Sequence, residues 1–386
     1  MSLSYIAKWV QETDTRWHRR ISSARRVLIN ARTAMNYSIV APIHRAMRGD
    51  PRVEFYFTAS EQPGAAREIY REAGDVRIIS PSRAALMKFD AYLVADMLWV
   101  KLPRGAQRIL MFHGVAGKYS HIYDRPDRSM RDWDRLFFIN RRRLENFIRA
   151  GAIDADSRAA RLVGYPKLDC LVDGSLNRDD VVAKLGIDPS RQTVLYAPTW
   201  SPYSSLNAMG EDLVRKLIAA GFALIVKLHD RSRDPRFIHS GGIDWAARLE
   251  PLLCEGGGVL ASGGDACPYL AAADAMITDH SSVGFEYLLL DRPLIRIEMP
   301  ELIEKTDVNR EYVALMAEAA TTVRDADEAV EAVGRALADR SHLSQSRRAV
   351  ARELFYEPGT ATARAVSEMY EVIELDTAVA VANACG

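Results

Sequence analysis

At 386 residues, the chain is longer than one ordinary hydrophobic core organises, and a usual domain size of about 150 residues predicts two domains. It carries 51 lysine and arginine residues against 51 aspartate and glutamate residues, which excludes a protein-wide positive field for nucleic acid. Its four cysteines show no CxxC spacing, and no apolar run approaches about 18 residues. We therefore expect no zinc knuckle, no membrane-spanning helix and a cytoplasmic location.

The first 26 residues combine apolar and basic side chains near helical spacing. The apolar members are Ile6, Trp9, Val10, Trp17 and Ile21. Tryptophans beside a basic face suit an anionic bilayer, so this helix is a candidate for peripheral contact with the cytoplasmic face of the cell membrane. The same pattern also fits a helix packed on the first domain, and the sequence leaves both interpretations open.

Short apolar runs rich in β-branched and aromatic residues alternate with longer helical patterns along the chain. A first group of predicted strands comprises 26–30, 52–59, 76–80, 91–95, 108–113 and 135–140. A second group comprises 161–166, 193–200, 222–229, 257–262, 275–279 and 293–298. Such alternation is typical of parallel sheets with right-handed crossovers, so each half is predicted to be a doubly wound α/β domain. Apolar content falls near 165–190, and we expect domains over 1–168 and 169–386.

Four predicted strands end in short polar motifs. These are FHG at 112–114, YAPTW at 196–200, KLH at 227–229 and TDHSS at 278–282. In open α/β sheets, ligands bind beyond the carboxyl ends of the strands, where loops and helix N-termini converge. We therefore expect the site residues of the protein in these four motifs.

The TDHSS motif runs into a predicted helix and offers Thr278, Asp279, Ser281 and Ser282 as binding residues. Serine hydroxyls and the unpaired N–H groups of a helix start attract anions, phosphate above all. A plain helix cap is the alternative for the two serines. Glu286 stands one turn into the helix, where it could bind a ribose hydroxyl or simply face solvent.

Two histidines follow other strands. His113 stands at a strand end before Gly114, where a missing side chain lets a ligand approach, and its imidazole could take a proton from an attacking alcohol. Lys227 and His229 alternate along one strand, so both could reach a phosphate. Thr199 in YAPTW offers a hydroxyl. The alternatives are a structural histidine at 113, a solvated lysine at 227 and a plain loop around Thr199, and none of these signals is specific alone.

Taken in order, these motifs resemble the CDP-glycerol glycerophosphotransferase family, which includes teichoic acid primases and polymerases. The resemblance runs from about residue 108 to residue 370, through HG, GYPKLD, YAPTW, KLH, ADAMITDHSS, DRP and EPGTATAR. Its most specific part is ADAMITDHSSVGFEYLLLDRP.

The resemblance implies a GT-B architecture, in which two Rossmann-like domains face a central cleft and the second holds the donor nucleotide. It implies transfer of glycerol phosphate from CDP-glycerol to a hydroxyl of a lipid-linked or polymeric cell-envelope acceptor. His113 would be the general base, His229 would contact the donor pyrophosphate, and Ser281 with Ser282 would bind its phosphates. Lys227 and Thr199 are further phosphate candidates. We identify no aspartate cluster that requires a metal ion, and we predict no cofactor.

Two positions depart from the family pattern. Asp230 stands where the family usually has proline, and His280 where it usually has tyrosine. Because Asp230 adds a negative charge beside the expected pyrophosphate, CDP-ribitol or a nucleotide sugar stays open as donor. Two further alternatives are a GT-B glycosyltransferase or UDP-sugar 2-epimerase, and a non-catalytic protein that binds nucleotides or wall precursors.

Overall fold

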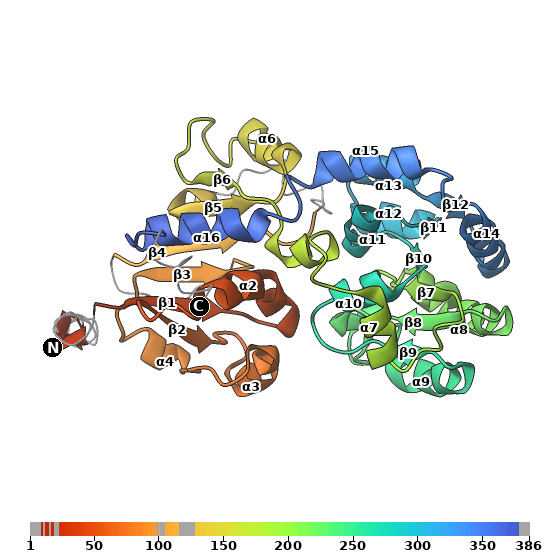
Figure 1. Cartoon of the computed structure of the whole chain (residues 1–386), viewed down its shortest axis with the longest axis horizontal. Helices are drawn as coiled ribbons and strands as arrows, with labels where there is room; N and C mark the ends of the chain where they lie inside the picture. The colour runs from red at the N-terminus through yellow and green to blue at the C-terminus, as the bar shows by residue number, and fades with distance from the viewer. Residues whose placement is uncertain are drawn as a thin grey trace. The chain divides into compact units, whose positions relative to one another are not determined.

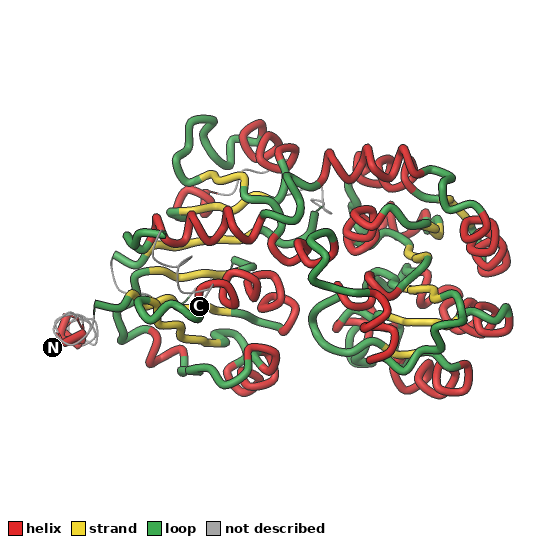
Figure 2. The backbone as a smooth tube through the Cα atoms, viewed as in Figure 1, coloured by secondary structure: helices red, strands yellow, loops and turns green. Residues whose placement is uncertain are grey.

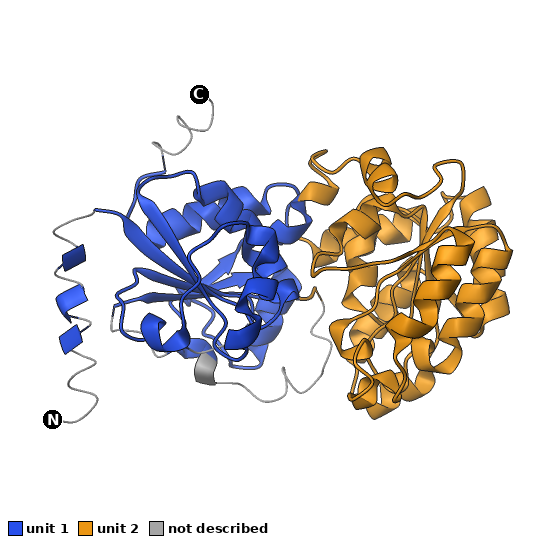
Figure 3. Ribbon diagram, turned by 90° about the horizontal axis from the view of Figure 1, so that it is seen from below, with its two compact units in different colours: residues 1–113, 126–169, 356–386 blue, residues 114–125, 170–355 orange. Residues whose placement is uncertain are grey.

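The structure, a computed structural model, describes residues 9–10, 12–14, 17–18, 23–97, 100, 105–115 and 128–377. It divides into two compact units, coloured separately in Figure 3. Unit 1 comprises residues 1–113, 126–169 and 356–386, and unit 2 comprises residues 114–125 and 170–355. Each unit holds one six-stranded sheet with helices around it (Figure 2). The predicted α/β class with two parallel sheets is confirmed.

In unit 1 the strands are all parallel and lie in the order β2-β1-β3-β4-β5-β6 (Figure 1). They are β1 (Arg25–Asn30), β2 (Val53–Thr58), β3 (Ala91–Val94), β4 (Gln107–Met111), β5 (Arg135–Phe138) and β6 (Ala160–Leu162). The α-helices of this unit are α2 (Ala34–Met47), α3 (Ala66–Ile69), α4 (Pro81–Ala84), α6 (Arg141–Arg149) and α16 (Ala361–Val372). Strand β3 is buried at all four positions, as expected of a parallel strand covered on both faces.

Two predicted strands of this region differ from expectation. Residues 76–80 form only an isolated bridge between Phe57 and Ile78, beside β2, which is the edge strand of the described sheet. The strand predicted at 161–166 belongs to the first sheet, where β6 pairs with β5 and Arg161 lies opposite Phe137. Its assignment to the second group was wrong, because the composition of a three-residue strand does not indicate which strand it pairs with.

Unit 2 has the strand order β9-β8-β7-β10-β11-β12, all parallel. The strands are β7 (Thr193–Tyr196), β8 (Ala223–Val226), β9 (Val259–Leu260), β10 (Ala275–Thr278), β11 (Leu294–Ile297) and β12 (Thr321–Val323). The α-helices are α7 (Arg178–Lys184), α8 (Ser205–Ala219), α9 (Trp245–Gly256), α10 (Cys267–Ala272), α11 (Ser282–Tyr287), α12 (Pro300–Lys305), α13 (Arg310–Ala319), α14 (Ala326–Ala338) and α15 (Ser344–Leu354). This is the Rossmann order, which reverses direction between β7 and β10 and so favours a ligand site there.

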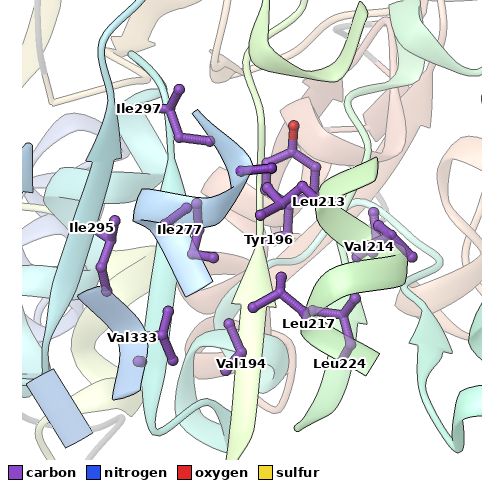
Figure 4. Packing of buried hydrophobic residues seen from close by; sticks show 14 of the residues in the cluster. Val194, Tyr196, Leu213, Val214, Leu217, Leu224, Ile277, Ile295, Ile297 and Val333 are labelled. Atoms are coloured by element: carbon purple, nitrogen blue, oxygen red, sulfur yellow. The ribbon is translucent and has the colours of Figure 1, made fainter. Parts of the chain in front are cut away.

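The core on one side of this sheet joins strands to α8 and α14. Val194, Ile277 and Ile295 project from the strands toward Leu217 of α8 and Val333 of α14, and all five side chains are fully buried (Figure 4). Burial of this kind stabilises by roughly 1.5–3 kcal/mol per large aliphatic side chain. It fixes the strands whose carboxyl ends carry the polar motifs.

The C-terminal helix α16 belongs to unit 1, whereas the expected second domain extended to residue 386. Asp169, which is buried, holds it there: one carboxylate oxygen accepts from the backbone N of Gly359 at 2.8 Å and Ala361 at 3.2 Å, and the other from Thr362 at 2.7 Å. Arg364 donates to the carbonyl of Val163 at 2.9 Å. The GYPKLD and EPGTATAR motifs therefore interlock, although some 190 residues separate Asp169 from Gly359.

The backbone conformation at position 164 of the same motif requires glycine. Its φ of +86° lies in the left-handed region, and a Cβ there would meet the carbonyl oxygen of Tyr356 at 2.5 Å. This close approach places Tyr356, where the chain returns to unit 1 (the returning segment, residues 356–372), against the end of β6.

The N-terminal segment is described only in part, and residues 1–8, 11, 15–16 and 19–22 of the predicted helix lie outside the described residues. Asp14 ties the segment to unit 1 through an ion pair with Arg26 at 2.8 Å and a bond from the backbone N of Lys88 at 2.8 Å. Trp9 and Trp17 are 64% and 65% exposed. Among the described helices, none is long and apolar enough to cross a membrane.

Candidate active site

In unit 1, His113 follows β4 at the carboxyl edge of the sheet and is partly exposed. Its Nδ1 lies 2.6 Å from the carbonyl oxygen of Ala95, which follows the neighbouring β3. A carbonyl only accepts, so Nδ1 carries the hydrogen, and in the neutral ring Nε2 is left with a lone pair. Burial lowers the pKa of His113, and the positive charge of Arg143 adds to this effect, while Asp96 opposes it. The imidazole is therefore held neutral and able to accept a proton.

Arg143 fixes the backbone of His113. Its guanidinium donates to the carbonyl of His113 at 3.1 Å and stacks 4.5 Å from the ring centre of Phe112. Arg143 is buried, so it is a structural support and not part of an exposed basic surface. Gly114 next to His113 has a φ of +71°, a left-handed conformation that favours glycine.

In unit 2, Asp279 ties the loops after β7 and β10 together. One carboxylate oxygen accepts from the backbone N of Thr199 at 2.8 Å and of His280 at 2.6 Å. The other accepts from the backbone N and the hydroxyl of Ser205, both at 3.0 Å, at the start of α8. The hydroxyl of Thr278 donates to the carbonyl of Ala197 at 2.7 Å. Asp279 and Thr278 are fully buried and engaged within the protein, at the switch point between β7 and β10.

Ser281 and Ser282 follow directly and are half-buried at the start of α11. Ser281 is extended, with φ −99° and ψ 141°, but its side chain makes no capping hydrogen bond. No hydrogen bond of either hydroxyl is found among the described residues. Glu286 of the same helix is only 3% exposed, so the solvent-facing alternative for this residue is excluded.

The motif after β8 presents Lys227 and His229, both partly exposed. The ammonium of Lys227 donates to the carbonyl of Gly263 at 3.1 Å. The Nδ1 of His229 accepts from the backbone N of Arg231 at 3.2 Å, so the neutral ring carries its hydrogen on Nε2. His229 is thus arranged as a hydrogen-bond donor, the reverse of His113.

The structure brings the predicted residues together within each unit at the carboxyl edge of its sheet. In unit 2, strands β7 and β10 are adjacent and parallel, and at or just after their ends lie Thr199, Thr278, Asp279, Ser281 and Ser282. The next strand, β8, is followed by Lys227 and His229. Sequence reasoning did not predict the pair formed by Trp200 and Arg231, which stack on one another after β7 and β8. It could not have found them, because no spacing rule relates an aromatic and a basic residue in different loops. Within the described part of the chain, no three His, Cys, Asp or Glu side chains converge as metal ligands.

Comparison with solved structures shows a shared fold. The wall teichoic acid polymerase TagF, in a variant soaked with CDPG, superposes with a TM-score of 0.70 at 16% identity, over 92% of this chain and 90% of that one. The UDP-GlcNAc 2-epimerase from Neisseria meningitidis, bound to UDP-GlcNAc, has a TM-score of 0.56 at 11% identity, over 90% of this chain and all of the other. These likenesses match the expected GT-B type of two Rossmann-like units.

Comparison of sequences points to one family. The teichoic acid poly(glycerol phosphate) polymerase of Staphylococcus epidermidis is 24% identical over 172 residues, which is 42% of this chain and only 22% of that relative's length. The model of the CDP-glycerol:poly(glycerophosphate) glycerophosphotransferase family matches residues 14–371. Because this match covers most of the chain, the protein belongs to the CDP-glycerol:poly(glycerophosphate) glycerophosphotransferase family.

Proposed function

We propose that the protein transfers glycerol phosphate from CDP-glycerol to a hydroxyl of a lipid-linked or polymeric cell-envelope acceptor. The family match over residues 14–371 carries this proposal. The similarity to a teichoic acid polymerase and to the TagF structure soaked with CDPG supports it. In this proposal unit 1 is the acceptor domain and unit 2 is the donor domain.

His113 would act as the general base. Its Nε2 takes the proton of the acceptor hydroxyl while the acceptor oxygen forms a bond to the phosphorus that bears glycerol. The bond from this phosphorus to the bridging oxygen breaks, and CMP leaves with the electron pair. Because the pKa of His113 is lowered by burial, the neutral base persists below pH 6.5, the ordinary value for histidine.

Unit 2 would bind the donor at the switch point of its sheet. Ser281 and Ser282 offer two hydroxyls and the N–H groups that begin α11, and these suit a diphosphate. His229 donates from Nε2, with Lys227 and Thr199 as further polar contacts. Glu286, buried in α11, is the proposed ribose partner. Thr278 and Asp279 act by positioning these loops, since their polar atoms already bond within the protein.

The test combines turnover with donor binding. Replacing His113 by glutamine should lower CMP release from CDP-glycerol and a lipid-linked glycerol phosphate acceptor by about 100- to 10,000-fold, with unchanged donor affinity. The same change at His342, an exposed histidine, serves as the control. Near-normal turnover by the His113 variant would remove it as the base. Binding and conversion of UDP-GlcNAc, with none of CDP-glycerol, would instead establish a nucleotide-sugar enzyme.

We also propose that the N-terminal segment rests on an anionic membrane surface. Trp9 and Trp17 are mostly exposed, while Asp14 pairs with Arg26 of unit 1. Replacing both tryptophans by alanine should reduce sedimentation with vesicles that contain phosphatidylglycerol. Equal sedimentation of this variant and the unchanged protein would refute the proposal.

A further inference from the structure

A cation lies on an aromatic ring at the carboxyl edge of the unit 2 sheet. Trp200 follows β7 and Arg231 follows β8, and these strands are adjacent, with Tyr196 opposite Val226. The guanidinium carbon of Arg231 lies 4.4 Å from the ring centre of Trp200. His239 packs edge-on against the same indole, with ring centres 4.7 Å apart. Trp200 therefore holds a guanidinium beside the loop that carries His229.

The side-chain N–H groups of Arg231 are not engaged by any described residue. Arg231 is exposed and makes no ion pair and no side-chain hydrogen bond with any residue that the structure describes. Its neighbours differ: Arg233 donates to the carbonyl of Ala261, and Arg236 pairs with Asp234 through two nitrogens. Asp230 brings a negative charge close to the expected pyrophosphate. It is exposed, and among the described residues it forms no ion pair with Arg231 or Arg233. The five N–H donors of Arg231 are thus available to an anion.

Arg231 and His229 are coupled through the backbone. The N–H of Arg231 donates to Nδ1 of His229, so the neutral imidazole carries its hydrogen on Nε2. The short turn Asp230–Ser232 and its N-cap His229 therefore carry an imidazole donor and a planar cation together. Guanidinium binds phosphate oxygens in pairs, and a tetrahedral phosphate group offers several acceptor oxygens at once, so phosphate fits this arrangement.

We propose that Arg231, stacked on Trp200 and acting with His229, binds the second phosphate of a nucleoside diphosphate donor. The inference deepens the proposed function and rests on it for the identity of the nucleotide. Stacking on one indole face favours recognition of phosphate by Arg231 over stacking of a nucleobase on that same face. In this chain the cation offsets the negative charge that Asp230 brings to the turn.

The test compares nucleoside diphosphates with monophosphates by calorimetry on the full chain. The unchanged protein should bind CDP more tightly than CMP. Replacing Arg231 by glutamine should weaken CDP binding about tenfold or more, as expected for a charge-assisted hydrogen bond, and leave CMP binding unchanged. Arg231→Lys should recover part of the loss, and Trp200→Leu should weaken CDP binding by releasing the guanidinium. Arg236→Gln, a nearby exposed arginine, is the matched control and should bind CDP normally.

Each outcome of these measurements supports or overturns the proposed role of Arg231. Equal affinity of the unchanged protein for CDP and CMP, or equal loss of both ligands in Arg231→Gln, would overturn the assignment to the second phosphate. Full CDP affinity in Arg231→Gln would remove Arg231 from the site. If the protein prefers UDP to CDP, the proposed donor is wrong, while the same comparison of UDP with UMP still tests Arg231. Because Arg231 is exposed, its variants should unfold at the unchanged temperature.

Discussion

Replacing Asp169 by alanine removes the acceptor for three backbone N–H groups where α16 begins. In the intact protein these groups belong to Gly359, Ala361 and Thr362. A carboxylate at a helix start also interacts favourably with the helix dipole. We therefore expect Asp169→Ala to detach the returning segment from unit 1.

The loss of folding free energy in Asp169→Ala depends on whether water can replace the lost carboxylate at each N–H group. Gly359 and Thr362 are partly exposed, so water can reach their N–H groups, and the loss there is that of a helix cap, about 1 kcal/mol. Ala361 is fully buried, and an unsatisfied N–H there costs about 1–3 kcal/mol. The free energy of unfolding of unit 1 should fall by about 2–4 kcal/mol.

Hydrogen exchange followed by mass spectrometry measures this effect separately in each unit. Exchange should accelerate in α16 and in α2, which packs beside it, and stay unchanged in α8 and α14 of unit 2. Asp173→Ala removes an exposed carboxylate that accepts from a single backbone N, that of Ser175, and should change stability by less than about 0.5 kcal/mol. If Asp169→Ala leaves exchange in α16 at its original rate, the interlock does not hold the helix.

Two other changes test the supports of the fold. Asp279→Ala should lower the free energy of unfolding of unit 2 by about 3–5 kcal/mol in urea unfolding, because it removes the acceptor of the buried N–H groups of Thr199 and Ser205. The same change should weaken CDP-glycerol binding. Asp279→Asn keeps one acceptor oxygen and should lower the stability less. Burial, reinforced by Arg48 and Arg45, lowers the pKa of His44 from 6.5 to about 4, so the unfolded chain binds the proton more readily as pH falls below 6.5. Unfolding free energy should therefore drop by about 1 to 2 kcal/mol between pH 7 and pH 5, and His44→Phe should abolish that share of the dependence; an identical drop in the variant would show that His44 is not its source.

Periodicity was sufficient to predict the class of fold, because parallel strands covered on both faces are apolar throughout. It was insufficient at the sheet edges. Residues 76–80 have the composition of a strand but make one bridge, and β12, with only three residues and two threonines, escaped notice. The place of α16 depends on Asp169, a contact between residues almost 200 positions apart, which no local pattern encodes.

Within the candidate site, the rule that ligands lie beyond strand ends selected loops that the structure places at the carboxyl edges of the two sheets. It did not separate residues that face a ligand from residues that hold the loops. Thr278 and Asp279 look like ligand contacts in sequence, yet their polar atoms bond inside the protein. The stacking of Trp200 on Arg231 was not predicted, because it arises only when β7 and β8 pair.

The interlock between Asp169 and the segment at 359–362 also sets an order of events during synthesis. Residues 170–355 have all been translated before Gly359 leaves the ribosome, so the sheet of unit 2 can complete itself early. The strands of unit 1 are synthesised first, but this unit is incomplete until α16 has been synthesised and packs on it. A nascent chain that has emerged from the ribosome as far as residue 355 can therefore contain a folded unit 2, whereas unit 1 still lacks α16.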